Sequence, residues 1–142
     1  MVLRITKQLS FEMAHALLGY DGKCQNIHGH SYKLFVTVEG VPLHDNSNHK
    51  NGMVMDFGDV KRCIEETIIQ KFDHALVLPP SDRYDPEALK PIAKLLVVPF
   101  QPTTENLLMH FAELLQPAIP QNLKLYSLRL HETETSYAEL FL

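Results

Sequence analysis

Apolar and polar side chains alternate along two long stretches in the N-terminal half of the chain. Residues 3–15 are apolar at most odd-numbered positions and polar at most even-numbered ones, with Lys7 as a polar exception on the apolar side. Residues 28–40 repeat this period of two and are rich in β-branched and aromatic residues. Such alternation is typical of half-buried β-strands. Turn-forming residues lie between them, in GYDGKCQN, so we expect the strands to pair through a longer loop.

The middle of the chain changes to a helical period. Apolar residues between 57 and 72 recur every three or four positions, and Asp56 is a suitable N-cap for a helix there. A second apolar stripe predicts a helix over residues 104–116. The polar stretch 41–52 is expected to be a turn-rich connection, followed by a short strand at residues 53–57.

The rest of the chain completes an alternating order of elements. The proline-rich stretch 79–102 predicts an irregular connection with a short helix at residues 86–90. Residues 124–142 predict two strands joined by a tight turn near 133–136. The order ββααββ indicates an α+β protein with an antiparallel sheet and helices on one face. We expect one domain over residues 1–142.

Composition narrows the class of protein. The chain has 142 residues, is 45% hydrophobic and 21% charged, and carries a formal net charge of −4. This acidic balance argues against nucleic acid as a partner, and no apolar run is long enough to cross a membrane. The N-terminus lacks the apolar core of a signal peptide, so we expect a cytoplasmic protein in which Cys24 and Cys63 are free thiols.

Three histidines are placed to share a metal ion. His28 and His30 are two positions apart on one predicted strand, so their side chains leave the same face, and Gly29 removes bulk between them. His15 ends the preceding strand, and antiparallel pairing would bring it close. Zn²⁺ is the usual guest of neutral imidazole ligands, and three protein ligands with one open position are typical of a catalytic site.

The spacing alone is compatible with two roles for Cys24. It could close the site as a fourth zinc ligand. Alternatively, its thiolate could lie beside the metal, where positive charge would lower its pKa and prepare it as a base or nucleophile.

Four further residues carry candidate chemistry. Asp73 could fix the tautomer of His74 for proton transfer, although a histidine at a helix end is also favoured by the dipole. Alternation along the last strands directs Glu132 toward the buried face, where a ligand with N–H donors would satisfy it, unless the strand has already returned to solvent. Glu105 lies in the first turn of the second helix, where the dipole stabilises a carboxylate in any case.

Six motifs occur in a fixed order along the chain: FEMAHAL, C-x-x-x-H-G-H-S-Y, G-M-V-M-D-F-x-D-V-K, F-D-H-A-L, P-T-T-E-N and H-E-T. In this order they resemble the 6-pyruvoyltetrahydropterin synthase / 6-carboxytetrahydropterin synthase family, from about residue 5 to the C-terminus. The resemblance implies the tunnelling fold (T-fold), whose element order is the one given above. It also implies a homo-oligomer, a hexamer built from trimers, with sheets joined into a barrel and active sites between chains.

The resemblance assigns roles to the candidate residues. It implies a zinc ion held by His15, His28 and His30, and Cys24 as a base rather than a ligand. It further implies that Asp73 and His74 form a relay with Cys24. It implies as well that two glutamates contact the substrate, a pterin triphosphate, with Glu132 anchoring the pterin ring and Glu105 matching a second contact.

The variant of the aspartate motif favours one branch of the family. M-D-F-x-D-V-K resembles the 6-carboxytetrahydropterin synthases of queuosine biosynthesis more than the biopterin enzymes, and the presence of Cys24 weighs against the folate-type variants. The alternatives are a 6-pyruvoyltetrahydropterin synthase and a non-catalytic zinc- or pterin-binding module. The departures from the family pattern are the long turn 41–52 and the proline-rich stretch 79–102.

Overall fold

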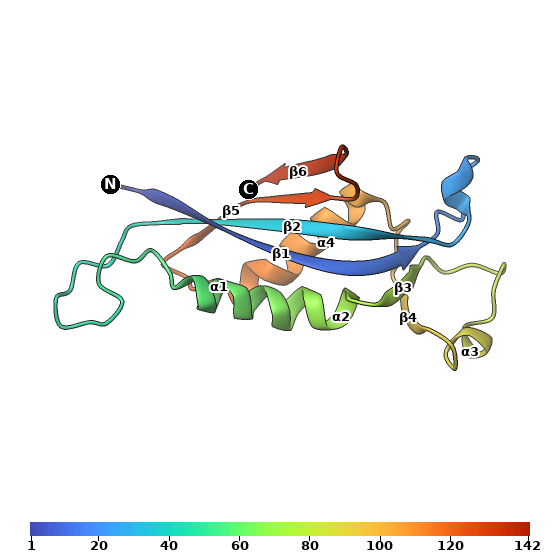
Figure 1. Ribbon diagram of the computed structural model, residues 1–142, viewed down its shortest axis with the longest axis horizontal. Coiled ribbons are helices and arrows are strands. Elements are labelled where there is room, and N and C mark those ends of the chain that lie inside the picture. The colour runs from blue at the N-terminus through green and yellow to red at the C-terminus, as the bar shows by residue number, and fades with distance from the viewer.

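A six-stranded sheet forms one layer of the molecule, and its strands lie in the order β4-β3-β1-β2-β5-β6 (Figure 1). The computed structural model describes all residues, 1–142. The strands are β1 Leu3–His15, β2 His28–Gly40, β3 Ala75–Leu78, β4 Lys94–Val97, β5 Lys124–His131 and β6 Tyr137–Phe141. The pairs β1–β2, β2–β5 and β5–β6 are antiparallel, whereas β3 is parallel to both β1 and β4.

The long hairpin of β1 and β2 is the backbone of the sheet and confirms the two predicted N-terminal strands. Its ladder is regular from the Leu3–Gly40 pair to the His15–His28 pair. Residues at odd-numbered positions of β1 face the core, and Phe11 and Met13 are buried there. The loop between the strands contains a short 3₁₀ turn, η1 Lys23–Gln25.

Helices cover one face of this sheet (Figure 1). The first is continuous from residue 57 to residue 72 and consists of α1 Phe57–Ile64, the π-helical segment η2 Glu65–Ile69 and α2 Gln70–Phe72. The carboxylate of Asp56 caps it by accepting a hydrogen bond from the Gly58 N–H at 2.7 Å. The second is α4 Thr104–Leu115, followed by η3 Gln116–Ala118. Both predicted helices are therefore confirmed.

The π-helical segment follows from the spacing of the apolar residues. Val60, Ile64, Ile68 and Phe72 are all buried and each is four positions from the next. An α-helix turns 100° per residue, so three steps of four residues would rotate the stripe by about 120°. The wider π turn reduces this drift. It therefore keeps Phe72 on the core side at the point where the helix ends before Asp73.

Two strands and one loop differ from the sequence prediction. β4 lies in the stretch 79–102, which was expected to be irregular, and no element was predicted at β3. Both are runs of only four residues without alternation, a pattern that periodicity cannot recognise. The prediction of a short strand at residues 53–57 is wrong. Met53 closes the preceding loop, since its carbonyl accepts from the Leu43 N–H at 2.9 Å, and Asp56 already caps the helix. The short helix is confirmed as α3 Pro86–Leu89.

The core lies between the sheet and the two helices. α4 contributes buried side chains along one stripe: Leu107, Leu108, Phe111, Ala112 and Leu115. Phe111 meets Phe72 of the first helix edge to face, with ring centroids 4.8 Å apart. No helix combines the length and the apolar character that crossing a bilayer requires.

Candidate metal centre and active site

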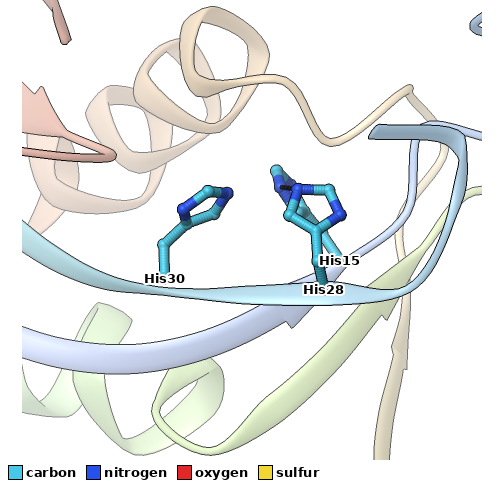
Figure 2. A group of neighbouring side chains, drawn as sticks. All are labelled: His15, His28 and His30. Atoms are coloured by element: carbon cyan, nitrogen blue, oxygen red, sulfur yellow. Dashed lines mark hydrogen bonds between the residues drawn. The ribbon is translucent and has the colours of Figure 1, made fainter. Parts of the chain in front are cut away.

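The end of the β1–β2 hairpin brings three histidines together on the helix side of the sheet. His15 lies directly opposite His28, and His30 lies opposite Met13, one step along the same face. The imidazole rings point toward one another from the two strands (Figure 2). One ligand nitrogen from each ring lies within 4.8 Å of the others. The spacing H-x-H and the strand pairing are sufficient to create this arrangement.

The hydrogen bonds of two rings fix which nitrogen is free to bind a metal. Nδ1 of His15 lies 2.8 Å from the Pro102 carbonyl oxygen, and Nδ1 of His28 lies 2.7 Å from that of Asn26. A carbonyl oxygen only accepts, so each Nδ1 carries the proton and each Nε2 carries a lone pair. These two Nε2 atoms are 3.0 Å apart. Two lone pairs at that distance repel each other unless a cation lies between them.

The third ring supports the same interpretation. Nε2 of His30 is buried and has no hydrogen-bond partner. A buried nitrogen without a partner is costly, and a metal ion would satisfy it. The three residues therefore fit a divalent metal bound by three imidazole nitrogens, a donor set that suits zinc.

Burial favours the neutral form, which a metal needs, in the rings of His15 and His30. His15 is 1% exposed, and desolvation is the main reason that its pKa lies below the usual value. Burial likewise lowers the pKa of His30, against the opposing effect of the Glu132 carboxylate. Only neutral imidazole binds a metal, so the environment favours the ligand form.

Glu132 borders the histidine centre. It follows β5 directly, and its Oε1 atom lies 3.6 Å from Nε2 of His15 and 3.6 Å from Nε2 of His30. The side chain is 27% exposed, so this carboxylate is directed to the three histidines rather than returned fully to solvent. The alternation along β5 indicated the buried side correctly, but it did not indicate the histidines as neighbours.

Cys24 shares a pocket with both predicted substrate-binding glutamates. The pocket has a volume of about 220 Å³ and is lined by Cys24, Glu105, Glu132 and residues of the β5–β6 turn. Cys24 lies in η1, is partly exposed and forms no disulfide. Its carbonyl accepts from the Leu17 N–H at 2.8 Å, which anchors the loop to the end of β1. The group of potential metal ligands contains the three histidines and not this thiol.

His74 lines a different pocket. It has a volume of about 460 Å³, and its lining includes Glu12 and Ser31 of the hairpin, His74, Ile92 and Lys94, the first residue of β4. Cys24 is not among its lining residues. Within one chain, the structure therefore does not bring the Asp73–His74 pair into the pocket that holds Cys24.

The turn that carries this pair is strained and tightly held. His74 has a φ of 59° and is the only residue other than glycine with a positive φ. That conformation costs about 1 kcal/mol or more for a residue with a Cβ atom. The Oδ2 atom of Asp73 lies 3.0 Å from Nδ1 of His74, while its Oδ1 atom accepts from the Glu12 N–H at 2.9 Å.

The same contacts set the charge of Asp73. The Glu12 N–H is the main reason that the pKa of Asp73 lies below its usual range, with further contributions from His74 and Lys94. Asp73 is therefore an anion that can hold Nδ1 of His74 in its protonated tautomer. The His74 side chain is 76% exposed, so its other nitrogen is free to meet another group.

Sequence reasoning missed several residues that support the site. The carbonyl of Pro102 had no sequence signal, because a backbone oxygen can come from any residue. Tyr32 continues the alternation of His28 and His30, and its buried hydroxyl lies 3.5 Å from Nδ1 of His15. That alternation could have identified Tyr32. Lys94 was missed because the strand that carries it was not predicted.

The fold and the three-histidine cluster define an α+β protein that could bind a metal ion beside a pocket containing a thiol and two carboxylates. Comparison with known proteins is more specific. The family model described as 6-pyruvoyl tetrahydropterin synthase matches residues 4–141. The chain therefore belongs to this family of synthases.

Individual relatives agree with this assignment. The chain is 37% identical over 142 residues to the 6-carboxy-5,6,7,8-tetrahydropterin synthase of Haemophilus influenzae, covering 97% of this chain and 98% of that protein. It is 36% identical over 142 residues to the 6-pyruvoyl tetrahydrobiopterin synthase of Poecilia reticulata, covering 92% and 84%.

A solved structure agrees as well. The 6-pyruvoyl tetrahydropterin synthase of Caenorhabditis elegans has the same fold, with a TM-score of 0.68, 23% identity and coverage of 99% and 96%. The expected tunnelling fold is thus confirmed. The sheet differs from the expected four strands by the two short strands β3 and β4.

Proposed function

We propose that the chain is a zinc-dependent 6-carboxy-5,6,7,8-tetrahydropterin synthase. The substrate would be 7,8-dihydroneopterin triphosphate, and the products 6-carboxytetrahydropterin, acetaldehyde and triphosphate, with uptake of one water. The observation that carries the proposal is the similarity over nearly the whole chain to relatives of that name, including 37% identity to the Haemophilus influenzae protein. The product would serve queuosine biosynthesis in the cytoplasm.

His15, His28 and His30 would hold the zinc ion. When bound, zinc supplies a Lewis acid that lowers the pKa of hydroxyl groups on the pterin side chain. The hydrogen bonds from Nδ1 of His15 and His28 to backbone carbonyls orient those two rings for this role. The unpartnered Nε2 of His30 supports its assignment as the third ligand.

Cys24 and His74 would move protons between the side-chain carbons and oxygens of the substrate. The thiol of Cys24 would act as the base, and His74 would exchange protons with it while Asp73 holds the imidazole. Glu132 would accept hydrogen bonds from N–H groups of the pterin ring, and Glu105 would make a second contact. The shared pocket of Cys24 with both glutamates supports this division of roles.

The relay requires two copies of the chain, because Cys24 and His74 line different pockets of one copy. The sheet offers a way to join copies. β6 pairs only with β5, and β1 pairs only with β2 before residue 13, so β6 and the N-terminal part of β1 each leave an edge open for pairing. We propose that β1 of one copy joins β6 of the next into a barrel, in a hexamer built from trimers, with the Asp73–His74 pair serving a neighbour's Cys24.

A 6-pyruvoyltetrahydropterin synthase is the second candidate, and the 36% identity to the Poecilia reticulata enzyme favours it. The two reactions differ in the fate of the three-carbon side chain. Loss of triphosphate followed by internal rearrangement keeps all three carbons, whereas carbon–carbon cleavage releases two of them as acetaldehyde.

Product analysis distinguishes the candidates. The purified zinc-loaded protein is incubated with 7,8-dihydroneopterin triphosphate, and the pterin products and acetaldehyde are measured by mass spectrometry. We expect 6-carboxytetrahydropterin and acetaldehyde in equal amounts. A pterin that keeps all three side-chain carbons would favour the second candidate. Unchanged substrate, together with a Cys24 thiol that zinc protects from alkylation, would indicate a non-catalytic binding module.

A further inference from the structure

Lys94 is the first residue of β4, and it lies directly opposite Ala75, the residue that follows His74. Its ammonium group is not directed freely into solvent. Nζ donates to the Gln70 carbonyl oxygen at 2.8 Å and to the Asp73 carbonyl oxygen at 2.9 Å. Carbonyl groups at a helix C-terminus carry partial negative charge and lack partners within the helix, so a cation is favoured there.

The contact with the Asp73 carbonyl has a direct consequence for His74, because the two residues share one peptide group. The C=O of that group accepts from Lys94, and its N–H donates to the Glu12 carbonyl oxygen at 2.6 Å. Both sides of the peptide plane are therefore held, one by a side chain of β4 and one by the backbone of β1. The orientation of this plane sets φ of His74, the angle that has the unfavourable value of 59°.

We propose that Lys94 is a positioning residue for His74. By holding the peptide group between Asp73 and His74, it keeps the strained backbone of His74 in place and directs the imidazole into the pocket that Lys94 also lines. The inference rests on the proposed proton-transfer role of His74. It adds the requirement that the direction of the imidazole be fixed through the backbone, because a side chain that is 76% exposed has few packing contacts of its own.

The test compares variants at Lys94 in the zinc-loaded protein. Lys94→Met keeps the aliphatic stem and removes the donor, whereas Lys94→Arg keeps a cation with several N–H donors. Lys90→Met is the matched control, because Lys90 contacts only Glu87 on the surface of the same connection. Zinc content and the midpoint of thermal unfolding are measured for each variant, and Lys94→Leu, which also lacks a donor, replaces the Met variant if that one does not fold.

For Lys94→Met, we expect kcat to fall by about tenfold to a hundredfold, the effect of a small displacement of a reacting group, with KM nearly unchanged. Lys94→Arg should restore most of the loss, and Lys90→Met should behave as wild type. If Lys94 acts through His74, adding Lys94→Met to a His74→Ala protein should reduce kcat little further.

Three results would overturn the inference, and they can be told apart. A rise in KM with kcat retained would show that Lys94 binds the triphosphate instead. Equal losses from Lys94→Met in the wild-type and His74→Ala backgrounds would show that it does not act through His74. Full activity of His74→Ala itself would remove the proposed role of His74, and the inference with it.

Discussion

Replacing His30 by alanine tests the proposed metal centre most directly, because this residue should matter for stability mainly when metal is bound. In the metal-free protein, Nε2 of His30 is buried without a partner. Removing that atom relieves about 1–3 kcal/mol of desolvation cost. The same change also removes the packing of a mostly buried ring, a loss of similar size. We therefore expect His30→Ala to change the metal-free stability by no more than about 1 kcal/mol.

With zinc present, the effect of His30 on the free energy of unfolding becomes much larger. A ligand that binds only the folded state stabilises it by about 4 kcal/mol at a thousand times its dissociation constant. For a chain of 142 residues, that corresponds to a rise of about 10 °C in the midpoint of thermal unfolding. His30→Ala should lose most of this rise, because two imidazoles bind zinc much more weakly than three.

Thermal unfolding with and without zinc measures both values, and metal analysis measures the zinc bound per chain. His131→Ala is the matched control: His131 is a partly buried histidine at the end of β5, outside the metal-binding cluster. We expect about one zinc per chain in the wild type and in the control. If His30→Ala kept its full zinc content and its zinc-dependent rise in midpoint, the three-histidine centre would be refuted.

Three further predictions concern the proposed catalytic groups. Cys24→Ala should keep zinc and fold but lose at least about a hundredfold in turnover; near wild-type turnover would move the base elsewhere, first to His74. Dissociating and reassembling an equal mixture of Cys24→Ala and His74→Ala proteins should restore about a quarter of the wild-type activity, because each site draws from two chains; no recovery, or a fully active monomer, would refute the shared site. The lowered pKa of Asp73 implies stabilisation that is complete above pH about 4, its value in the unfolded chain, and is lost as the pH falls through the lower folded value. Urea unfolding should therefore show a stability gap between wild type and Asp73→Asn at pH 6 that narrows by pH 3, whereas a gap independent of pH would exclude this linkage.

Much of the fold could be predicted because its main elements have strong periods. The hairpin, both long helices and the final strand pair follow from alternation, helical stripes and caps such as Asp56. β3 and β4 could not be predicted in this way. Each has only four residues, too few to show a period, and β3 is also buried along its whole length, so it has no polar positions that would reveal a strand.

The candidate site likewise has residues that the sequence predicts and supporting contacts that it does not predict. The histidines follow from strand parity, because the period of two fixes which side chains share a face. The contacts that orient them come from elsewhere: the partner of His15 is the carbonyl of Pro102, 87 positions away. The proposed support of His74 by Lys94 could not be predicted, because Lys94 lies on β4, a strand that periodicity does not detect. Long-range contacts to backbone atoms leave no pattern in the residue types.

The origin of the three histidines in one hairpin has a consequence for folding kinetics. His15 and His28 are 13 positions apart in the sequence. They face each other at the loop end of the β1–β2 ladder, so the pairing of the two strands next to the loop brings them together. A hairpin closes within about 1–10 μs, well before contacts between distant segments form. The three candidate metal ligands can therefore meet while the helices are still unfolded, and an ion captured then would fix the strand register before the later segments fold onto it.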